Sequence, residues 1–344
     1  MKDKVYIRVD ANGQIAMGHL MRTLSIAEAV RAMGGDGCFI TADHNCDEKI
    51  QNSGFEMICL ESAWDQLNQE IEGMIELIKE RQIKCLLVDS YFVTPEYFEN
   101  LSQWTNIVYI DDLKAFPYKC HSIINYVIGE NGQDYSYFGG NVYAGAGYVP
   151  LRKEFLKDED RQLSSGLDRI MVTTGGADMH HFGMLFLDAF LKDDRFADCA
   201  VTLIVGSKNT DKEYILDTYS DEKRVSVVVD ANNMGALMRE ADCIVSAGGT
   251  TLYEACAAQT PAISYAVADN QLVNVKRFDE LAGLYYAGDL REGVSQVVLR
   301  ILDRLYMMKS VEMREEVKKS MVSVVDGNGA ARIASVLLNA IEGV

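Results

Sequence analysis

The residue types best suited to chemistry are concentrated between Arg8 and Arg22, in the stretch RVDANGQIAMGHLMR. The stretch follows an apolar-alternating run at residues 4–9, typical of a first β-strand, and leads into a helical pattern from about Gly18 to Met33. His19 falls in the first turn of that helix. A histidine takes up a proton near neutral pH, and a nearby carboxylate such as Asp10 would orient the ring and raise its basicity. We expect His19 and Asp10 to be catalytic.

The same loop is a predicted ligand site. Open α/β sheets bind ligands beyond the carboxyl ends of their strands, and a helix N-terminus offers free N–H groups to an anion. Gly18 lets the backbone approach a ligand without a Cβ in the way. We expect Gly18, Arg8 and Arg22 to bind substrate. The alternative for Arg22 is an ion pair with Asp10 that only holds the loop.

Two further predicted strands end in acidic residues. The apolar runs at residues 83–89 and 106–110 end in Asp89 and in the pair Asp111 and Asp112. Carboxyl ends of parallel strands meet at one edge of a sheet, so we expect these acids close to His19. Asp89 is predicted to be catalytic, and Tyr91 and Asp112 to bind a polar substrate. Asp112 is equally consistent with an N-cap of a following helix.

The elements that must position these residues alternate between short apolar runs and amphipathic ones. In the first half, strands are also predicted at 37–41 and 55–60 and a helix at 64–82, whereas 125–148 is a Gly-, Asn- and Tyr-rich loop and 151–169 a charged linker. The second half repeats the rhythm, with strands predicted at 169–174, 200–205, 224–229, 243–247 and 261–265.

This rhythm predicts the α/β class, with two Rossmann-like βαβ domains that face each other across a cleft. The predicted parts are an N-terminal domain at 1–152, a C-terminal domain at 168–326 and a final segment at 327–344.

Two glycine turns follow strands of the second half, Gly175-Gly176 and Gly248-Gly249. Backbone N–H groups at two such turns on one sheet can hold a phosphate, although each can also be a tight turn and no more. No Lys follows them as in a Walker A loop, and neither forms a full GxGxxG fingerprint.

The composition limits the classes of partner that the protein is expected to bind. The 344 residues carry a formal charge of −18 with 48% hydrophobic and 24% charged residues, as in a globular protein that binds neither nucleic acid nor anionic membranes. We expect no transmembrane segment and no signal peptide. The eight cysteines include no CxxC pair, which favours a reducing cytoplasm over disulfides or zinc. Nothing in the sequence indicates an oligomeric state.

The stretch from Arg8 to Arg22 resembles the signature R-x-D-x-x-x-x-x-G-x-G-H-x-x-R of the PseG/SpsG family, with Ala16 in place of the first glycine of G-x-G. The resemblance extends over almost the whole chain. It includes VDSY at 88–91, IDD at 110–112, GYVPLRKEF at 147–155, TTGGAD at 173–178 and DGNGAARI at 326–333. Residues 229–256 are also similar to the GT-B nucleotide site of the N-acetylglucosaminyltransferase that makes lipid II.

The resemblance implies a GT-B fold and a substrate that is a UDP-activated amino sugar. It also implies that residues 327–344 form a helix that crosses back onto the first domain. The family hydrolyses UDP-2,4-diacetamido-2,4,6-trideoxy-β-L-altropyranose to UDP and the free sugar, with no cofactor and no metal; His19 would be the base. The resemblance implies that uracil is read near Asn233 and Met234 and ribose by Glu254. The further substrate-binding residues expected from it are Arg152, Gly175, Gly176, Gly248, Gly249, Thr250, Gln271 and Asn274.

Three alternatives remain open on the sequence. The protein is a GT-B glycosyltransferase that uses a UDP-sugar donor and a sugar hydroxyl as acceptor, a hydrolase of a different nucleotide-activated sugar, or a nucleotide-sugar-binding protein without catalytic activity.

Overall fold

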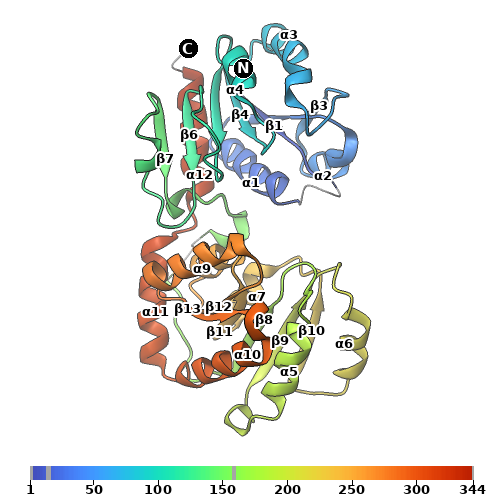
Figure 1. Cartoon of the computed structure of the whole chain (residues 1–344), viewed down its shortest axis with the longest axis vertical. Helices are drawn as coiled ribbons and strands as arrows, with labels where there is room; N and C mark the ends of the chain where they lie inside the picture. The colour runs from blue at the N-terminus through green and yellow to red at the C-terminus, as the bar shows by residue number, and fades with distance from the viewer. Residues whose placement is uncertain (1–2, 13–16, 157–159, 343–344) are drawn as a thin grey trace. The chain divides into compact units, whose positions relative to one another are not determined.

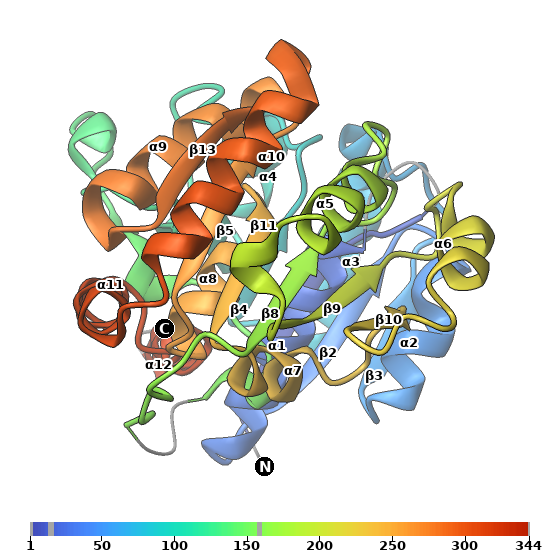
Figure 2. The same ribbon diagram turned by 90° about the horizontal axis from the view of Figure 1, so that it is seen from below.

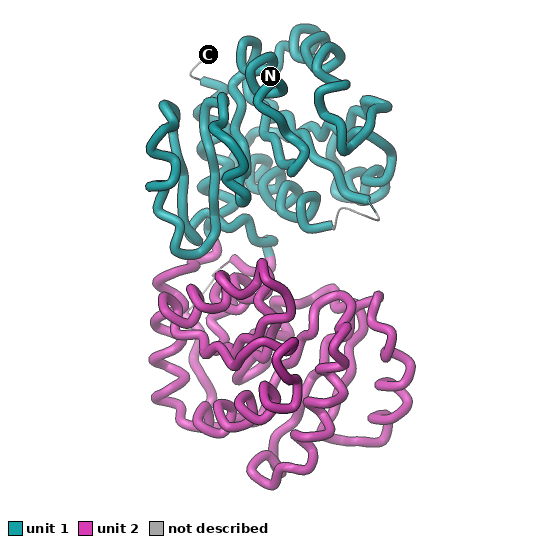
Figure 3. Tube along the Cα trace, in the orientation of Figure 1, with its two compact units in different colours: residues 1–153, 328–344 teal, residues 154–327 magenta. Residues whose placement is uncertain are grey.

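The computed structural model describes residues 3–12, 17–156 and 160–342, and the chain divides into two compact units (Figures 1 and 3). The first unit contains Met1–Lys153 and Asn328–Val344, and the second contains Glu154–Gly327. The chain therefore leaves the first unit once and returns to it with its last helix.

Within the described residues, the first unit is built on a seven-stranded parallel sheet of order β3-β2-β1-β4-β5-β6-β7. Its strands are β1 Lys4–Val9, β2 Asp36–Thr41, β3 Glu56–Cys59, β4 Cys85–Asp89, β5 Asn106–Ile110, β6 Ser122–Asn125 and β7 Asn141–Ala144. Its helices are α1 Gly18–Ala32, α2 Asp47–Asn52, α3 Ile71–Arg81, α4 Pro95–Leu101 and α12 Gly329–Glu342.

The strand order of this sheet decides where a ligand can bind. β1 pairs with β2 on one side and with β4 on the other, so the direction of winding reverses between β1 and β4. Such a reversal leaves a crevice at the carboxyl ends of the two strands. The side chains of β4 are all buried, as the continuous apolar run of 83–89 predicts for a parallel strand covered on both faces.

Two features of the first unit differ from the sequence prediction. The helix predicted over 64–82 is a 3₁₀ turn at Leu67–Glu70 followed by the shorter α3. The stretch 125–148, predicted to be a loop, contains β7, and β6 ends where that stretch begins. These strands have four residues each, and β7 is a partly exposed edge strand, so neither carries a long apolar period.

Within its described residues, the second unit is built on a six-stranded parallel sheet of order β10-β9-β8-β11-β12-β13. Its strands are β8 Arg169–Thr173, β9 Ala200–Val205, β10 Val225–Val229, β11 Cys243–Ala247, β12 Ala262–Ala266 and β13 Tyr285–Asp289. Its helices are α5 Phe182–Leu191, α6 Lys212–Thr218, α7 Met234–Glu240, α8 Thr251–Ala257, α9 Asp269–Ala282, α10 Leu290–Met307 and α11 Val311–Val324.

The winding of the second sheet reverses between β8 and β11. α5 and α10 lie side by side against this sheet (Figure 2). The sequence prediction omitted β13, whose residues YYAGD include Gly288 and form no apolar run.

The last helix, α12, packs on α1, β1, β4 and β5 of the first unit. It buries one face, formed by Ala330, Ile333, Ala334, Leu337 and Ile341, at helical spacing. The first position of the helix requires glycine, because a Cβ on Gly329 would lie 2.1 Å from the carbonyl oxygen of Val149.

One stretch, Val311–Glu342, is long and apolar enough to cross a membrane by length and composition alone. It runs through α11 and α12, which residues 325–328 separate. Buried core helices pass the same test, and 44% of its most apolar window is buried, so it is weak evidence for a span.

Candidate active site

The predicted chemistry of the first unit lies at the reversal between β1 and β4. Asp10 follows β1 directly, His19 is the second residue of α1, and Asp89 ends β4. These three line a small pocket with Ser90, Tyr91 and Phe92. Gly18 begins α1, and a Cβ there would meet nothing within 4 Å. Ala16, the departure from the family signature, lies outside the described residues.

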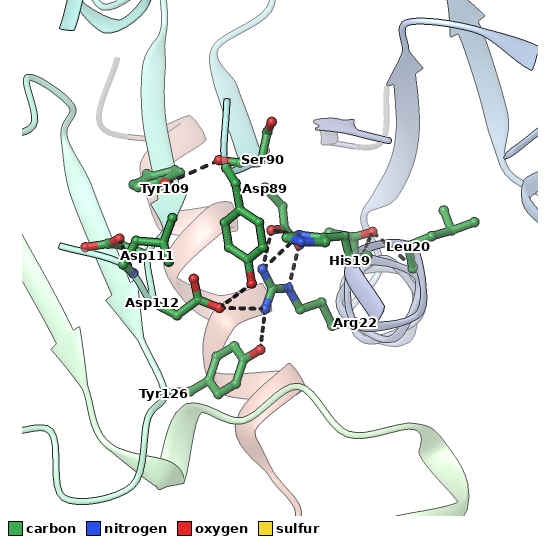
Figure 4. Close-up of polar contacts among 12 residues, drawn as sticks. His19, Leu20, Arg22, Asp89, Ser90, Tyr109, Asp111, Asp112 and Tyr126 are labelled. Carbon is green, nitrogen blue, oxygen red and sulfur yellow. Dashed lines mark hydrogen bonds and ion pairs between the residues drawn. The ribbon is translucent and has the colours of Figure 1, made fainter. Parts of the chain in front are cut away.

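His19 and Asp89 form a hydrogen bond between Nδ1 and Oδ1, which lie 2.6 Å apart (Figure 4). Both side chains are buried, with 7% of His19 and 1% of Asp89 exposed. Arg22 is the second partner of Asp89, because its Nε donates to Oδ2 at 2.6 Å and its second guanidinium nitrogen donates to Oδ1. The alternative pairing of Arg22 with Asp10 is therefore wrong.

The charge state of Asp89 follows from these contacts. Burial opposes ionisation, but the charge and hydrogen bonds of Arg22, with a smaller contribution from His19, lower the pKa of Asp89 to about 2. At neutral pH Asp89 is a carboxylate and can only accept hydrogen bonds. Nδ1 of His19 must then carry the proton it shares with Asp89, which leaves Nε2 of a neutral ring unprotonated. The contact of 3.0 Å between Arg22 and the same Nδ1 is consequently not a hydrogen bond.

Arg22 also connects Asp89, the partner of His19, to Asp112, the second residue after β5. Its guanidinium donates to the hydroxyl of Tyr126 and lies 3.5 Å from Oδ2 of Asp112 (Figure 4). Tyr91 donates its hydroxyl to the same Oδ2 at 2.9 Å, and its ring meets that of His19 edge-on, with centroids 4.5 Å apart. Tyr91, predicted from its place after Asp89, thus contacts both groups.

The two carboxylate oxygens of Asp112 differ in their contacts. Among the described residues, its Oδ1 is buried and has no hydrogen-bond partner. Because β5 leads through a loop into β6, no helix begins there for Asp112 to cap, so the N-cap alternative is wrong. Asp111 has the structural role instead, since it accepts bonds from the hydroxyls of Tyr118 and Tyr135.

Arg8 is placed differently from its prediction as a substrate ligand. Its side chain is fully buried. It donates to both carboxylate oxygens of Glu70, at 2.7 and 2.8 Å, and to Asp10 at 2.5 Å. Asp10 accepts a second bond from the N–H of Ala42 at 2.8 Å. Arg8 is not among the described residues that line the pocket, and its contacts hold Asp10, which favours a structural role.

Glu70 and Tyr126 are two polar residues around the site that the sequence prediction missed, and Phe92 of the pocket lining was missed as well. Glu70 falls within a stretch predicted to be one amphipathic helix, so nothing marks it as the partner of a buried arginine. Tyr126 belongs to the Tyr-rich stretch, and no local pattern distinguishes it from the neighbouring tyrosines. Arg152 is partly buried near the end of the first unit.

The two glycine turns of the second unit follow neighbouring strands, β8 and β11, at the carboxyl edge of the sheet. A Cβ at Gly175, Gly176 or Gly249 would meet nothing within 4 Å, so these three positions are open. Gly248 is pressed against α9, and a Cβ there would lie 2.3 Å from the side chain of Val275.

Several residues that are predicted to bind the nucleotide lie near the turn after β11. Asn274 of α9 donates to the carbonyl oxygen of Gly248 at 3.1 Å, and Gln271 accepts from the N–H of Val267 at 3.1 Å. Thr250 precedes α8, and Glu254 lies in its first turn. Asn233 and Met234 lie elsewhere, at the N-terminus of α7.

Comparison of the sequence with known proteins finds a matching family model and a relative that aligns over nearly the whole chain. Residues 169–325 match the family model described as glycosyltransferase family 28 C-terminal domain. Over 98% of this chain and 98% of its own length, the spore coat polysaccharide biosynthesis protein SpsG of Bacillus subtilis is 26% identical.

Two other relatives are longer than this chain. One is the Helicobacter pylori protein named pseudaminic acid cytidylyltransferase and UDP-2,4-diacetamido-2,4,6-trideoxy-beta-L-altropyranose hydrolase, 26% identical over 57% of this chain and 36% of its own length. The other, an uncharacterized protein of Methanocaldococcus jannaschii, is 24% identical over 73% of this chain. The match spans about half, 53%, of that protein.

Solved structures share the fold at low sequence identity. MurG of Acinetobacter baumannii aligns with a TM-score of 0.68 at 11% identity, over 98% of this chain and 99% of its own. The UDP-GlcNAc 2-epimerase of Neisseria meningitidis aligns with a TM-score of 0.67 at 11% identity, over 98% of this chain and 100% of its own. The relatives and the family model therefore support the PseG/SpsG family, and the chain has a two-domain α/β GT-B fold.

Proposed function

We propose that this protein hydrolyses a UDP-activated amino sugar, UDP-2,4-diacetamido-2,4,6-trideoxy-β-L-altropyranose or a close relative, to UDP and the free sugar. The observation that carries the proposal is the hydrogen bond between Nδ1 of His19 and Asp89, which leaves Nε2 of His19 free to accept a proton. The name of the Helicobacter pylori relative supports this reaction and this substrate.

In the proposed reaction, Nε2 of His19 removes a proton from a water molecule. The water oxygen bonds to the anomeric carbon as the bond from that carbon to the UDP oxygen breaks, and the electron pair of that bond leaves with UDP. Asp89 stabilises the imidazolium that forms, as the buried aspartate of a hydrolase triad does. No step requires a metal ion.

The acidic side chains and Tyr91 provide the negative charge and the hydrogen-bonding groups that a sugar substrate needs. Positive charge develops on the anomeric carbon and ring oxygen in the transition state, and a nearby carboxylate stabilises it. The partly exposed carboxylate of Asp112 is assigned as an acceptor for a hydroxyl or acetamido N–H of the sugar. Asp10, whose carboxylate is occupied by Arg8 and Ala42, is assigned an electrostatic role rather than proton transfer.

The second unit is assigned to UDP. Its turn at Gly175 and Gly176 is open, and backbone N–H groups there would stabilise the charge that UDP gains as it leaves. The N–H groups of Gly248 and Gly249 already donate to the carbonyl oxygens of Tyr265 and Ala247. This is the chemistry that a protein of charge −18 needs for an anionic substrate, because its overall field repels one.

The test is proton NMR of the UDP-sugar with wild type, His19→Ala and His181→Ala. His181 pairs with Asp211 on the surface of the second unit and serves as the matched control, since it lies outside the His19 pocket. We expect wild type and His181→Ala to release UDP and free sugar, and His19→Ala to lose the activity. If UDP binds while the sugar bond survives for hours at high protein concentration, the hydrolase proposal fails.

The match to a glycosyltransferase domain favours a second candidate, transfer of the sugar to a hydroxyl acceptor. The same geometry at His19 would deprotonate that hydroxyl. The two functions separate in one experiment, because a transferase consumes the UDP-sugar only after an acceptor is added.

A further inference from the structure

A second cluster of chemically active side chains lies on the first unit outside the His19 pocket. His44, Cys59 and Glu61 each offer one donor atom, and these atoms lie within 4.8 Å of one another. Cys59 ends β3, which pairs with β2 through Thr41, and His44 follows β2 after a short loop. The carboxyl ends of two neighbouring strands therefore bring the three side chains together.

The donor set is that of a transition metal. A thiolate, an imidazole nitrogen and a carboxylate oxygen are the three ligand types that Zn²⁺ takes in proteins, whereas Mg²⁺ and Ca²⁺ take oxygen ligands. Three protein ligands and one water complete a tetrahedral zinc site. Cys59 is partly exposed and Glu61 and His44 are exposed, so an ion can reach the cluster from solvent.

The orientation of His44 is the second observation. Its Nε2 faces Glu61 Oε1 at 2.8 Å, while its Nδ1 lies 2.7 Å from Oδ2 of Asp47. A metal-binding histidine almost always gives its other ring N–H to a carboxylate, which fixes the tautomer and turns the free nitrogen to the metal. Asp47 stands in that position, and its other oxygen, Oδ1, is buried without a hydrogen-bond partner among the described residues.

We propose that His44 Nε2, Cys59 Sγ and a Glu61 carboxylate oxygen bind one Zn²⁺ ion, with Asp47 orienting His44. When the ion binds, it replaces the thiol proton of Cys59, which passes to solvent.

The consequence is structural. The Cys59 thiol lies 3.6 Å from the carbonyl oxygen of Ala42, and the N–H of Ala42 donates to Asp10. Ala42 lies two residues before His44, so an ion that joins His44 to Cys59 restrains the segment whose N–H holds Asp10.

The experiment uses the full-length protein, freed of metal with a chelator and titrated with Co²⁺ and then Zn²⁺. We expect one Co²⁺ per chain, an ultraviolet charge-transfer band from cobalt–thiolate bonding, displacement by Zn²⁺ and a higher melting temperature with either ion. Cys59→Ser should abolish the band, His44→Ala should abolish stoichiometric binding, and Asp47→Asn should weaken binding about 10- to 100-fold.

Two controls test specificity. Cys120→Ser removes another partly exposed thiol, and His181→Ala removes another histidine paired with an aspartate. Both should bind cobalt as the wild type does. Circular dichroism without metal checks that each variant folds. The proposal is overturned if the wild type binds no stoichiometric ion, or if the Cys59→Ser protein keeps the charge-transfer band.

Discussion

His19 and Asp89 are 70 positions apart in the chain, yet Nδ1 of one lies 2.6 Å from Oδ1 of the other. The pairing of β1 with β4 makes this contact possible, because it sets Asp89 opposite Val9, at the end of the strand that precedes α1. The contact assigns the ring proton of His19 and therefore determines which nitrogen is available as a base.

Replacing Asp89 with Asn tests that assignment. An amide can donate to Nδ1 and so stabilise the wrong tautomer, in which Nε2 carries the proton. By analogy with the hydrolase triad, we expect kcat to fall by about 10⁴-fold with little change in KM. Steady-state hydrolysis assays measure both constants. A variant with normal kcat would show that Asp89 does not orient the base.

The low pKa of Asp89 makes a prediction about acid stability. The folded pKa of about 2 lies below the ordinary aspartate pKa of 3.8, so ionised Asp89 stabilises the folded state above pH 4 and loses this effect as the pH falls through 2. The shift corresponds to about 2 kcal/mol, of which about half is gone at pH 3. Urea unfolding of wild type and Asp89→Asn at pH 6 and pH 3 measures it. The stability difference between the two proteins should shrink at pH 3, and a constant difference would contradict the prediction.

The buried ion pairs of Arg8 make a prediction about folding rather than binding. Arg8→Met leaves Glu70 and Asp10 buried without their guanidinium partner. Breaking such a pair costs about 3–5 kcal/mol of unfolding free energy. Denaturant unfolding measures the loss, with Lys4→Met as the control on the same strand, because the Lys4–Glu56 pair is partly exposed. A loss below 1 kcal/mol in Arg8→Met would contradict a structural role for Arg8.

Gly248 and Gly249 form a matched pair of neighbouring glycines. Gly248→Ala forces a Cβ against Val275, and such overpacking costs about 1–3 kcal/mol, whereas Gly249→Ala adds a methyl group to open space. We expect Gly248→Ala to lower the melting temperature and Gly249→Ala to leave it unchanged.

Titration calorimetry with UDP then tests whether phosphate binds at this turn. If phosphate approaches the backbone at this turn, Gly249→Ala weakens UDP binding despite its normal stability. Unchanged affinity in Gly249→Ala would show that phosphate binds elsewhere.

The sequence by itself determined the local elements and most of the chemical groups. The apolar run of β4, the strand–loop–helix order around His19 and the glycine turns are all local patterns, and they predicted the α/β class and placed Asp89 and Tyr91 near His19. Short or partly exposed strands such as β7 and β13 carry too few apolar residues to be predicted this way.

Only the tertiary structure decided which charges pair. Arg8, Asp10, Arg22 and Asp89 offer several possible ion pairs in sequence, and the fold gives Arg8 to Glu70 and Asp10 but Arg22 to Asp89. The proximity of His44, Cys59 and Glu61 is also a result of the tertiary structure, because their spacing in the sequence matches no metal-binding motif. Pairing of this kind depends on strand order and on burial, which is set by contacts between residues far apart in the chain, and local sequence patterns contain neither.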